Sequence, residues 1–242
     1  MKHFALITPV PGTIETLIEN SILRKARTEG IVQFHVIDLR DFGKGNYRQI
    51  DDKPFGGGDG MILMAEPLSQ AIEMAIEKVG GLEGTHIVFP SPSGQIWSQD
   101  VATECSQLER VIFICGHYKG IDERIIEKYV THEYSIGDFV LTSGEVPAML
   151  ILDSMVRLIP GVLNSIESAL TDSFPHGLLD HPHYTQPRIV DDVAVPDVLL
   201  SGHHAKIQKW KKEKREERTQ KKRPDLWKKY LSEKNRNGRS EE

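Results

Sequence analysis

Residues 132–147 of the chain have the sequence HEYSIGDFVLTSGEVP. A polar and aromatic run ends at Ile136-Gly137, where glycine permits backbone angles that a side chain forbids. Gly144 opens a predicted helix that has Pro147 in its first turn. Such a loop can press bare backbone against a flat ligand, but Gly-Asp and Ser-Gly pairs are also ordinary turn residues. The patterns of the flanking segments are needed to distinguish a ligand-binding loop from a tight connection.

The segments around this loop alternate between strand-like and helix-like patterns. Compact apolar runs predict strands at 3–9, 31–39, 86–89 and 111–115. Apolar residues at helical spacing predict helices at 14–30, 66–79, 101–108, 122–129 and 145–159. Continuously apolar strands that alternate with helices are typical of an α/β fold, a parallel sheet with helices on both faces.

Three glycine-bearing loops follow the ends of predicted strands, at 90–94, 116–120 and 136–144. Ligands of parallel sheets bind at the carboxyl ends of the strands, so one pocket lined by all three loops is expected. The long segment 40–60 contains Gly56-Gly57-Gly58 but lacks the Lys-Ser/Thr that follows a phosphate-binding loop. We interpret it as a flexible lid over cofactor or RNA.

The composition restricts the class of protein. With 242 residues and 39% hydrophobic content, the chain can form a real core. It shows no apolar run long enough to span a membrane and no secretory signal, which predicts a cytoplasmic protein without a membrane partner. Two cysteines, Cys105 and Cys115, are too few for a disulfide framework or a zinc site.

Charge is distributed unevenly along the chain. Residues 206–242 contain 15 Lys and Arg against 7 Asp and Glu, a balance of +8, whereas residues 1–205 carry −13. A basic tail on an acidic body indicates a polyanionic partner. The alternative is a solvated helix face, because Glu213, Glu216 and Glu217 alternate with the lysines at pairing distance.

A polar, proline-rich stretch divides the chain. Pro175, Gly177, Pro182 and Pro187 interrupt residues 164–187, which predicts an interdomain linker. The expected domains are therefore 1–163 and a small helical domain at 188–242, with a long helix from about His203 and a short one after Pro224.

Several blocks, taken together, resemble one known family. In chain order they are Arg40-Asp41-Phe42, Asp51 to Met61, Ser91-Pro92-Ser93-Gly94, Cys115 to Arg124, residues 132–147, Ile159 to Leu163, Asp172-Ser173-Phe174, Gly177 to Asp180, Pro182 to Thr185 and Val198 to Ala205. They cover nearly the whole chain and resemble the bacterial tRNA (guanine(37)-N(1))-methyltransferases, the TrmD family of the SPOUT class. This family uses S-adenosyl-L-methionine to methylate N1 of guanosine 37, the nucleotide 3′ of the anticodon.

The resemblance implies features that periodicity does not show. It implies a deep trefoil knot over residues 86–147, an exception to the rule that chains do not thread loops. It also implies a homodimer that holds the tRNA anticodon arm between its subunits, and it leaves Mg2+ as a possible second cofactor. The implied cofactor-binding residues are Phe89, Pro90, Ser91, Gly116, Tyr118, Ile136, Gly137, Asp138, Phe139, Val140, Leu141, Gly144 and Pro147.

The resemblance assigns catalysis to two residues. Methylation of guanine N1 requires a base for its proton and a cation for the charge that collects on O6. Asp172 is the implied base and Arg157 the implied cation. The plainer alternatives are a turn residue for Asp172 and a surface pair with Asp153 for Arg157.

The tail has an implied role in RNA binding. Four lysines, Lys206, Lys209, Lys211 and Lys212, are the implied phosphate contacts, and we expect Trp210 to anchor its helix rather than stack on a base. The spacing of His181, His183, His203 and His204 fits no standard metal template, so we expect no metal centre and interpret them as RNA-facing or structural.

The chain departs from the family pattern at four positions, and two alternative functions remain open. His117 and Lys119 flank Tyr118 where many relatives have Arg and Glu, which puts an acidic contact at position 119 in doubt. Asp59 and Ser143 stand where Pro and Gly are common. One alternative function is methylation of ribosomal RNA. Another is an RNA-binding chaperone with a vestigial pocket, which would not bind S-adenosylmethionine.

Overall fold

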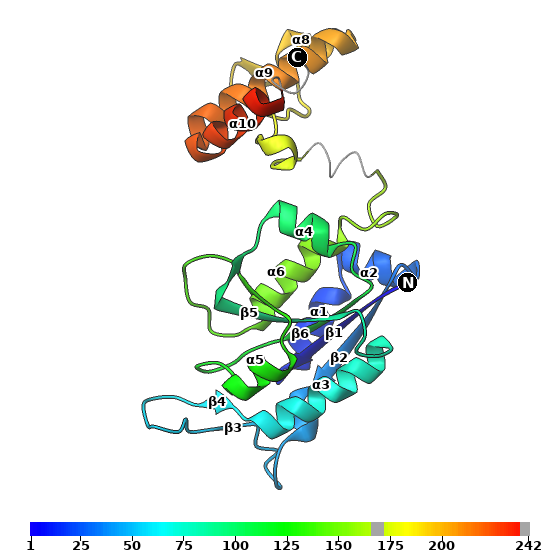
Figure 1. Ribbon diagram of the computed structural model, residues 1–242. Helices are drawn as coiled ribbons and strands as arrows, with labels where there is room; N and C mark the ends of the chain where they lie inside the picture. The colour runs from blue at the N-terminus through cyan, green and yellow to red at the C-terminus, as the bar shows by residue number, and fades with distance from the viewer. Residues whose placement is uncertain (166–171, 238–242) are drawn as a thin grey trace. The chain divides into compact units, whose positions relative to one another are not determined.

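The computed structural model describes residues 1–165 and 172–237. Residues 166–171 of the expected linker and 238–242 of the tail lie outside the described part. The chain divides into two compact units, Met1–Ile166 and Glu167–Glu242 (Figure 1).

The first unit is built on one five-stranded sheet. Its strands are β1 (Lys2–Thr8), β2 (Val32–Asp38), β5 (Thr85–Ile96), β6 (Arg110–Ile114) and β7 (His132–Ser135). They lie in the order β2-β1-β6-β5-β7, and every neighbouring pair is parallel. The prediction of an α/β fold with a parallel sheet is confirmed.

Helices cover both faces of this sheet (Figure 1). Phe4 and Leu6 of β1 join a core with α1 (Pro11–Ile18), α2 (Ser21–Thr28), α4 (Gln99–Cys105) and α6 (Glu145–Val156). Ala5 and Ile7 point to the other face, into a core with α3 (Ala65–Val79) and α5 (Glu123–Tyr129). This alternation of β1 explains its continuously apolar sequence, because both faces of the strand are buried.

Two predicted helices differ from those observed. The single helix expected over 14–30 is two helices, α1 and α2, because Asn20 takes extended angles (φ −116°, ψ 153°) as the residue that precedes α2. Asparagine favours such positions because its side chain competes with helical hydrogen bonds. The helix expected to end at Ile159 ends at Val156, and Leu158 and Ile159 continue in turns bonded to Met155 and Val156.

The third strand is longer than predicted. The Pro90–Gly94 segment, expected to be a loop after the strand, lies within β5, whose pairing with β7 shifts register between Pro90 and Gln95. Proline has no N–H for the ladder, so an irregularity at this place is expected from its chemistry. Gly94 passes so close to β7 that a Cβ there would lie 2.3 Å from the carbonyl carbon of Glu133.

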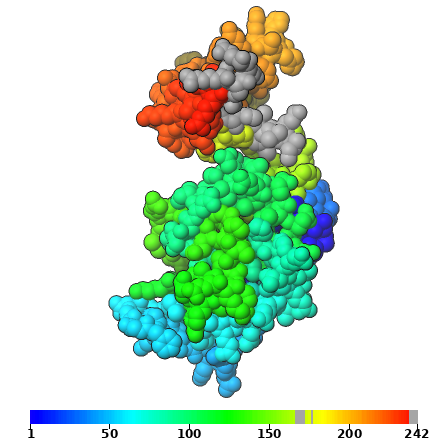
Figure 2. Space-filling view, viewed as in Figure 1, coloured from blue at the N-terminus to red at the C-terminus, as the bar shows by residue number. Residues whose placement is uncertain are grey.

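The segment between β2 and α3 projects from the first unit (Figure 2). It contains η1 (Leu39–Phe42) and a short antiparallel pair, β3 (Asp51–Asp52) with β4 (Ile62–Leu63). Gly56, Gly57 and Gly58 all have positive φ, and the neighbouring Phe55 is fully exposed. The interpretation of this segment as a lid stays a prediction.

The second unit is mainly helical. It contains η2 (Pro175–Gly177), the pair β8 (Ile189–Val190) and β9 (Val193–Ala194), α8 (Asp197–Leu200), α9 (His204–Lys222) and α10 (Pro224–Asn237). Tyr230 of α10 donates a hydrogen bond to Glu216 of α9 (2.9 Å), and the N–H of Leu179 donates to buried Thr219 of α9 (2.9 Å). Part of the segment predicted as a linker therefore packs on α9. Within the described ranges, every helix is too short or too polar to cross a membrane.

Candidate cofactor site

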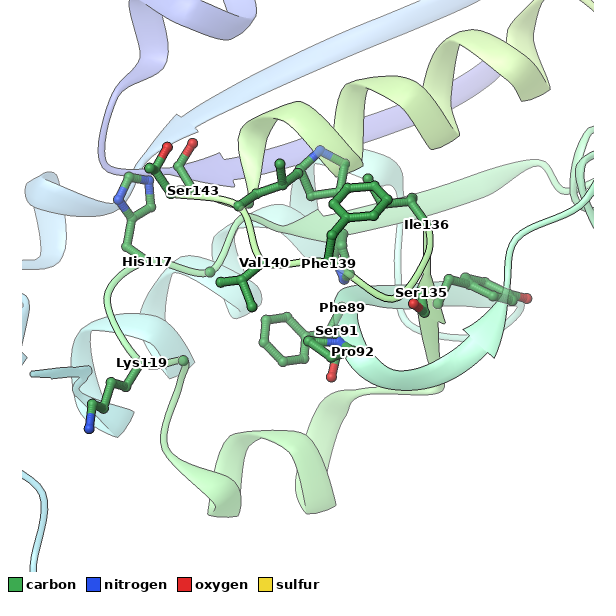
Figure 3. Close-up of a pocket in the computed structure, with 18 of the residues that line it drawn as sticks. Phe89, Ser91, Pro92, His117, Lys119, Ser135, Ile136, Phe139, Val140 and Ser143 are labelled. Carbon is green, nitrogen blue, oxygen red and sulfur yellow. The ribbon is translucent and has the colours of Figure 1, made fainter. Parts of the chain in front are cut away.

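A cavity of about 190 Å3 lies in the first unit, at the carboxyl ends of β6 and β7 and beside the register shift within β5 (Figure 3). Its walls come from the three segments at which the sequence predicts a pocket. The lining residues are Phe89 to Pro92, Gly116 to Gly120, Tyr134 to Gly137, Phe139 to Gly144 and Pro147. The three loops therefore meet at one place, as the position of parallel strand ends requires.

The structure brings the implied cofactor residues together. All of them except Asp138 line the cavity, and Asp138 is exposed to solvent in the described structure. Pro92, His117, Lys119, Gly120, Tyr134, Ser135, Thr142 and Ser143 also line it, although the sequence analysis did not assign them to the cofactor.

Two of the loops cross with almost no space between their backbones. The N–H of Gly144 donates to the carbonyl of Gly116 (2.7 Å), and a Cβ on Gly144 would lie 2.4 Å from the nitrogen of Gly116. His117 and Ser143 form an isolated β-bridge beside this crossing. A Cβ on Gly116 would lie 2.9 Å from the ring of Phe89. Close backbone approach therefore requires glycine at position 144, whereas a side chain at position 116 would displace the Phe89 ring.

The backbone on the cavity wall is tightly turned. Gly137 has φ +138°, its N–H donates to Ser135 Oγ (3.2 Å), and its carbonyl accepts from Phe139 N–H (2.9 Å). Tyr118 has φ +58°, a left-handed conformation that costs a non-glycine residue about 1 kcal/mol or more. Strained residues of this kind are concentrated at functional sites.

A buried polar network lies beneath the crossing. Nε2 of His117 lies 2.8 and 2.9 Å from the two carboxylate oxygens of Glu145, and Thr8 Oγ1 donates to Glu145 Oε1 (2.5 Å). Glu145 is 1% exposed. Burial alone would raise the pKa of Glu145, but the hydrogen bonds from His117 and Thr8 outweigh it and hold the pKa below its ordinary value. Glu145 is therefore a buried carboxylate in this site.

The sequence analysis missed this network. The available signal was a carboxylate at Glu145 at the start of an otherwise apolar helix, next to the unusual His117. Thr8 gives no signal, because it lies about 137 residues away in sequence and meets Glu145 only through the sheet.

Two buried groups beside the cavity, the Cys115 thiol and the Tyr134 phenol, have raised pKa values. Burial and the nearby charge of Glu145 raise the pKa of the Cys115 thiol well above its ordinary value. Burial and a hydrogen bond with Cys105 raise the pKa of Tyr134. A protonated thiol and phenol are poor nucleophiles, so neither Cys115 nor Tyr134 is suited to covalent catalysis.

The implied catalytic residues lie outside the cavity wall. Arg157 directly follows α6, at its C-terminal cap in the first unit. Asp172 belongs to the second unit, where its carbonyl accepts from Arg215 (3.4 Å). The implied RNA contacts Lys206, Lys209 and Lys212 are exposed on α9, Lys211 is half-buried, and Lys209 lies 3.9 Å from Glu213. Trp210 lies beside the rings of His181 and Tyr184.

The outer face of α6 carries an apolar pair. Val146 and Leu150 are 56% and 46% exposed, and exposed Asp153 and then Arg157 continue the same face at helical spacing. The rest of this helix is buried in the core of the first unit. The face that leads to Arg157 is thus apolar at one end and charged at the other.

Comparison with known proteins identifies the family. The model of the family described as tRNA (Guanine-1)-methyltransferase TrmD matches residues 1–229. Three relatives named tRNA (guanine-N(1)-)-methyltransferase are similar over most of their length. The protein of Borreliella burgdorferi is 48% identical over 230 residues, which cover 94% of each chain. The protein of Shouchella clausii is 48% identical over 225 residues, which cover 93% of this chain and 91% of the relative. The protein of Bacillus licheniformis is 47% identical over 236 residues, which cover 97% of this chain and 96% of the relative. With its sheet, its three-loop pocket and these matches, the chain belongs to the TrmD family of tRNA (guanine-1)-methyltransferases.

Proposed function

We propose that this protein transfers a methyl group from S-adenosyl-L-methionine to N1 of guanosine 37 in tRNA. Methylation of tRNA guanine at N1 follows from membership of the family and from relatives that carry that name. The observation that carries the finer proposal is the cavity at the strand ends, which is lined by the segments that resemble the family's donor site.

The residues of the cavity fit S-adenosylmethionine. Apolar side chains, among them Phe89, Ile136 and Leu141, offer faces for the adenine ring, and tightly turned backbone offers N–H and carbonyl groups for its edges. A side chain at Gly116 or Gly144 would not fit where the two loops cross, since a Cβ at either position would lie within 3 Å of neighbouring atoms. When bound, the donor supplies an activated methyl group on its sulfonium sulfur.

The size of the cavity suggests that its wall adjusts. At about 190 Å3 it is smaller than the roughly 300–1,000 Å3 of typical small-molecule sites. Phe139 and Val140, 55% and 91% exposed, stand on the outer loop and offer apolar surface that can cover a ligand (Figure 3). We propose that they close over the donor.

We propose that the first unit contains the trefoil knot of the SPOUT class. Two places where backbone segments far apart in sequence pass very close to each other support it: Gly94 against Glu133, and Gly144 against Gly116. Both lie within residues 86–147, and both are glycines at which a Cβ would overlap backbone atoms. A threaded chain needs such crossings, because side chains would keep the segments apart.

We propose a homodimer that forms through the outer face of α6. Val146 and Leu150 would bury apolar surface against a second copy, as exposed apolar patches commonly do. Arg157 on the same helical face would then lie beside the dimer interface, where a tRNA held between subunits can reach it.

The proposed chemistry assigns Asp172 as base and Arg157 as electrophilic partner. An aspartate with an ordinary pKa of about 3.9 is a weak base, so removal of the N1 proton has to be coupled to stabilisation of the charge on O6. A guanidinium keeps its charge at every physiological pH and presents several donors, so Arg157 is suited to O6. Asp172 accepts the proton, and the N1 lone pair then takes the methyl group.

The remaining parts of the proposal concern RNA and location. We propose three parts: a catalytic domain at 1–163, a linker at 164–187 and a basic, tRNA-binding domain at 188–242. The exposed lysines of α9 would contact phosphates of the anticodon arm. We place the enzyme in the cytoplasm with its tRNA substrate, and Mg2+ as a possible activator.

Methyl transfer to tRNA transcripts tests this function. The purified protein is incubated with labelled donor and a transcript that carries guanosine or adenosine at position 37, and nucleosides are identified by mass spectrometry. N1-methylguanosine in the first transcript alone supports the proposal. Equal labelling of both transcripts, or transfer to ribosomal RNA only, rejects it.

A further inference from the structure

A cluster of two histidines and one aspartate lies in the second unit, and none of the three residues lines the cavity of the first unit. Asp180, His181 and His183 each offer one ligand atom, and the three atoms lie within 4.8 Å of one another. The sequence analysis expected no metal centre here, because the spacing of the histidines fits no standard template. The turn at Pro182 places them together, which the spacing does not show.

The distances suit a small cation. Nε2 of His183 lies 2.8 Å from Asp180 Oδ2, and Nε2 of His181 lies 3.8 Å from Asp180 Oδ1. Zinc bonds of about 2.0–2.2 Å to histidine nitrogen and carboxylate oxygen place tetrahedral ligand atoms about 3.3–3.5 Å apart. The first separation is shorter than this value and the second is longer, and all three ligand atoms lie within 4.8 Å of one another, so side-chain shifts on the order of 1 Å would complete the geometry.

A backbone hydrogen bond orients His181 as a ligand. Nδ1 of His181 lies 3.0 Å from the carbonyl oxygen of Pro182, and a carbonyl can only accept, so Nδ1 carries a proton. In the neutral ring Nε2 then has a free lone pair, and it faces the Asp180 carboxylate. A cation between Nε2 of His181 and the Asp180 carboxylate, whose Oδ1 lies 3.8 Å away, would be bound by both groups. A carbonyl-bound Nδ1–H is also the usual second-shell arrangement of metal-bound histidine.

The carboxylate is held ready by the surrounding backbone. The N–H of Asp180 donates to Ser173 Oγ (3.0 Å), and the N–H of His181 donates to Asp180 Oδ1 (2.6 Å). These two hydrogen bonds fix the turn that carries the carboxylate.

The cluster is fixed on one side and open on the other. The side chains of Asp180 and His181 are 19% and 13% exposed, whereas that of His183 is 69% exposed. The residue before the cluster is bonded to α9, through Leu179 N–H to Thr219 (2.9 Å) and Arg215 to the Leu179 carbonyl (3.2 Å). Three ligands with solvent on one side leave a coordination position for water or another oxygen.

We propose that Asp180, His181 and His183 form a binding site for one divalent transition-metal ion of the Zn2+ type. Two imidazoles and a carboxylate favour Zn2+ and Co2+ over Mg2+, which prefers oxygen ligands. The ion takes the place of the proton between His183 and Asp180, and this proton leaves to solvent.

Metal titration of the full chain tests the site. Protein without a polyhistidine tag is stripped with chelator, and Zn2+, Co2+ and Mg2+ are titrated by calorimetry, with Co2+ also followed by its visible absorption. We expect one Zn2+ and one Co2+ per chain, no comparable Mg2+ binding, and no thiolate-to-cobalt band, since Cys105 and Cys115 are buried.

Two variants and one control decide the assignment. His183→Gln, at a largely exposed side chain, should leave the fold intact by circular dichroism and weaken Zn2+ at least about tenfold. His181→Gln should do the same, whereas His204→Gln, at an exposed histidine on α9, should bind like the unaltered protein. Absent Zn2+ binding in the unaltered chain, or equal affinity after His183→Gln, would overturn the proposal.

Discussion

Nε2 of His117 lies 2.8 Å from Oε1 and 2.9 Å from Oε2 of Glu145, and this pair joins two of the loops that form the cofactor cavity. His117 stands on the loop after β6, and Glu145 begins α6 directly after the loop that follows β7. Thr8, at the end of β1, donates to the same carboxylate. The carboxylate therefore connects the start of α6 to the end of β1 and to the loop after β6, beside the proposed donor site.

Removal of the imidazole should loosen this connection. In His117→Ala, Glu145 keeps its burial but loses its histidine partner, so we expect the free energy of unfolding to fall by about 2 kcal/mol. Affinity for S-adenosylhomocysteine, measured by calorimetry, should fall about tenfold, since the loops are less ordered before binding. The matched control His204→Ala should change neither quantity. Unchanged affinity in a destabilised His117→Ala protein would separate the network from ligand binding.

Acid should weaken the folded state through Glu145. Because its folded-state pKa is below the ordinary value of 4.5, the ionised side chain stabilises the fold at neutral pH, and this contribution is lost as pH falls through the folded-state pKa. Glu145→Gln removes the contribution. Urea unfolding at pH 7 and at about pH 4 should therefore show a larger loss for the unaltered protein than for the variant. Glu83→Gln, at an exposed side chain, should follow the unaltered protein.

The layers of the fold were predictable because each depends on local sequence. Strand β1 has apolar residues toward both faces, and Phe4 and Ala5 confirm the two cores that this pattern predicts. The break at Asn20 was not predicted, because apolar spacing continues across it and only the capping residue marks the boundary. The extension of β5 through Pro90 was hidden because proline and glycine are usual in loops and equally usual in bulges.

The cavity could be predicted from the sequence, whereas the polar network beside it could not. Glycines after strand ends predict a pocket, since parallel strands end at one edge. The pairing of Glu145 with Thr8 depends on sheet order, and the cluster at His181 depends on one turn at Pro182. Both are contacts that spacing along the chain does not encode.

A charge on the outer face of α6 should prevent dimer formation. In Leu150→Glu, the carboxylate would have to be buried against the second copy, so light scattering after gel filtration should show a shift from dimer to monomer. Leu82→Glu, at a leucine that is 58% exposed outside this helix, serves as the control and should stay dimeric. A Leu150→Glu protein with the mass of a dimer would exclude this face as the interface.

Loss of lysines from α9 should reduce the salt dependence of tRNA binding. Each phosphate contact contributes about 0.7–0.9 to the slope of log affinity against log salt, so the triple variant Lys206→Ala, Lys209→Ala, Lys212→Ala should lower the slope by about 2. Fluorescence anisotropy between about 50 and 200 mM salt measures it. Lys78→Ala, at an exposed lysine of α3, should leave the slope unchanged. A slope that the triple variant does not alter would place the RNA elsewhere.

The role of Asp172 is tested most directly by Asp172→Asn in single-turnover transfer to a tRNA transcript with guanosine at position 37. Asparagine preserves size and hydrogen-bonding capacity but cannot accept the N1 proton as a carboxylate does. Donor and tRNA affinities are measured on the same preparation, so that a binding defect is recognised. We expect near-normal affinities with transfer reduced by about 100-fold or more, whereas transfer at the unaltered rate would rule out Asp172 as the base.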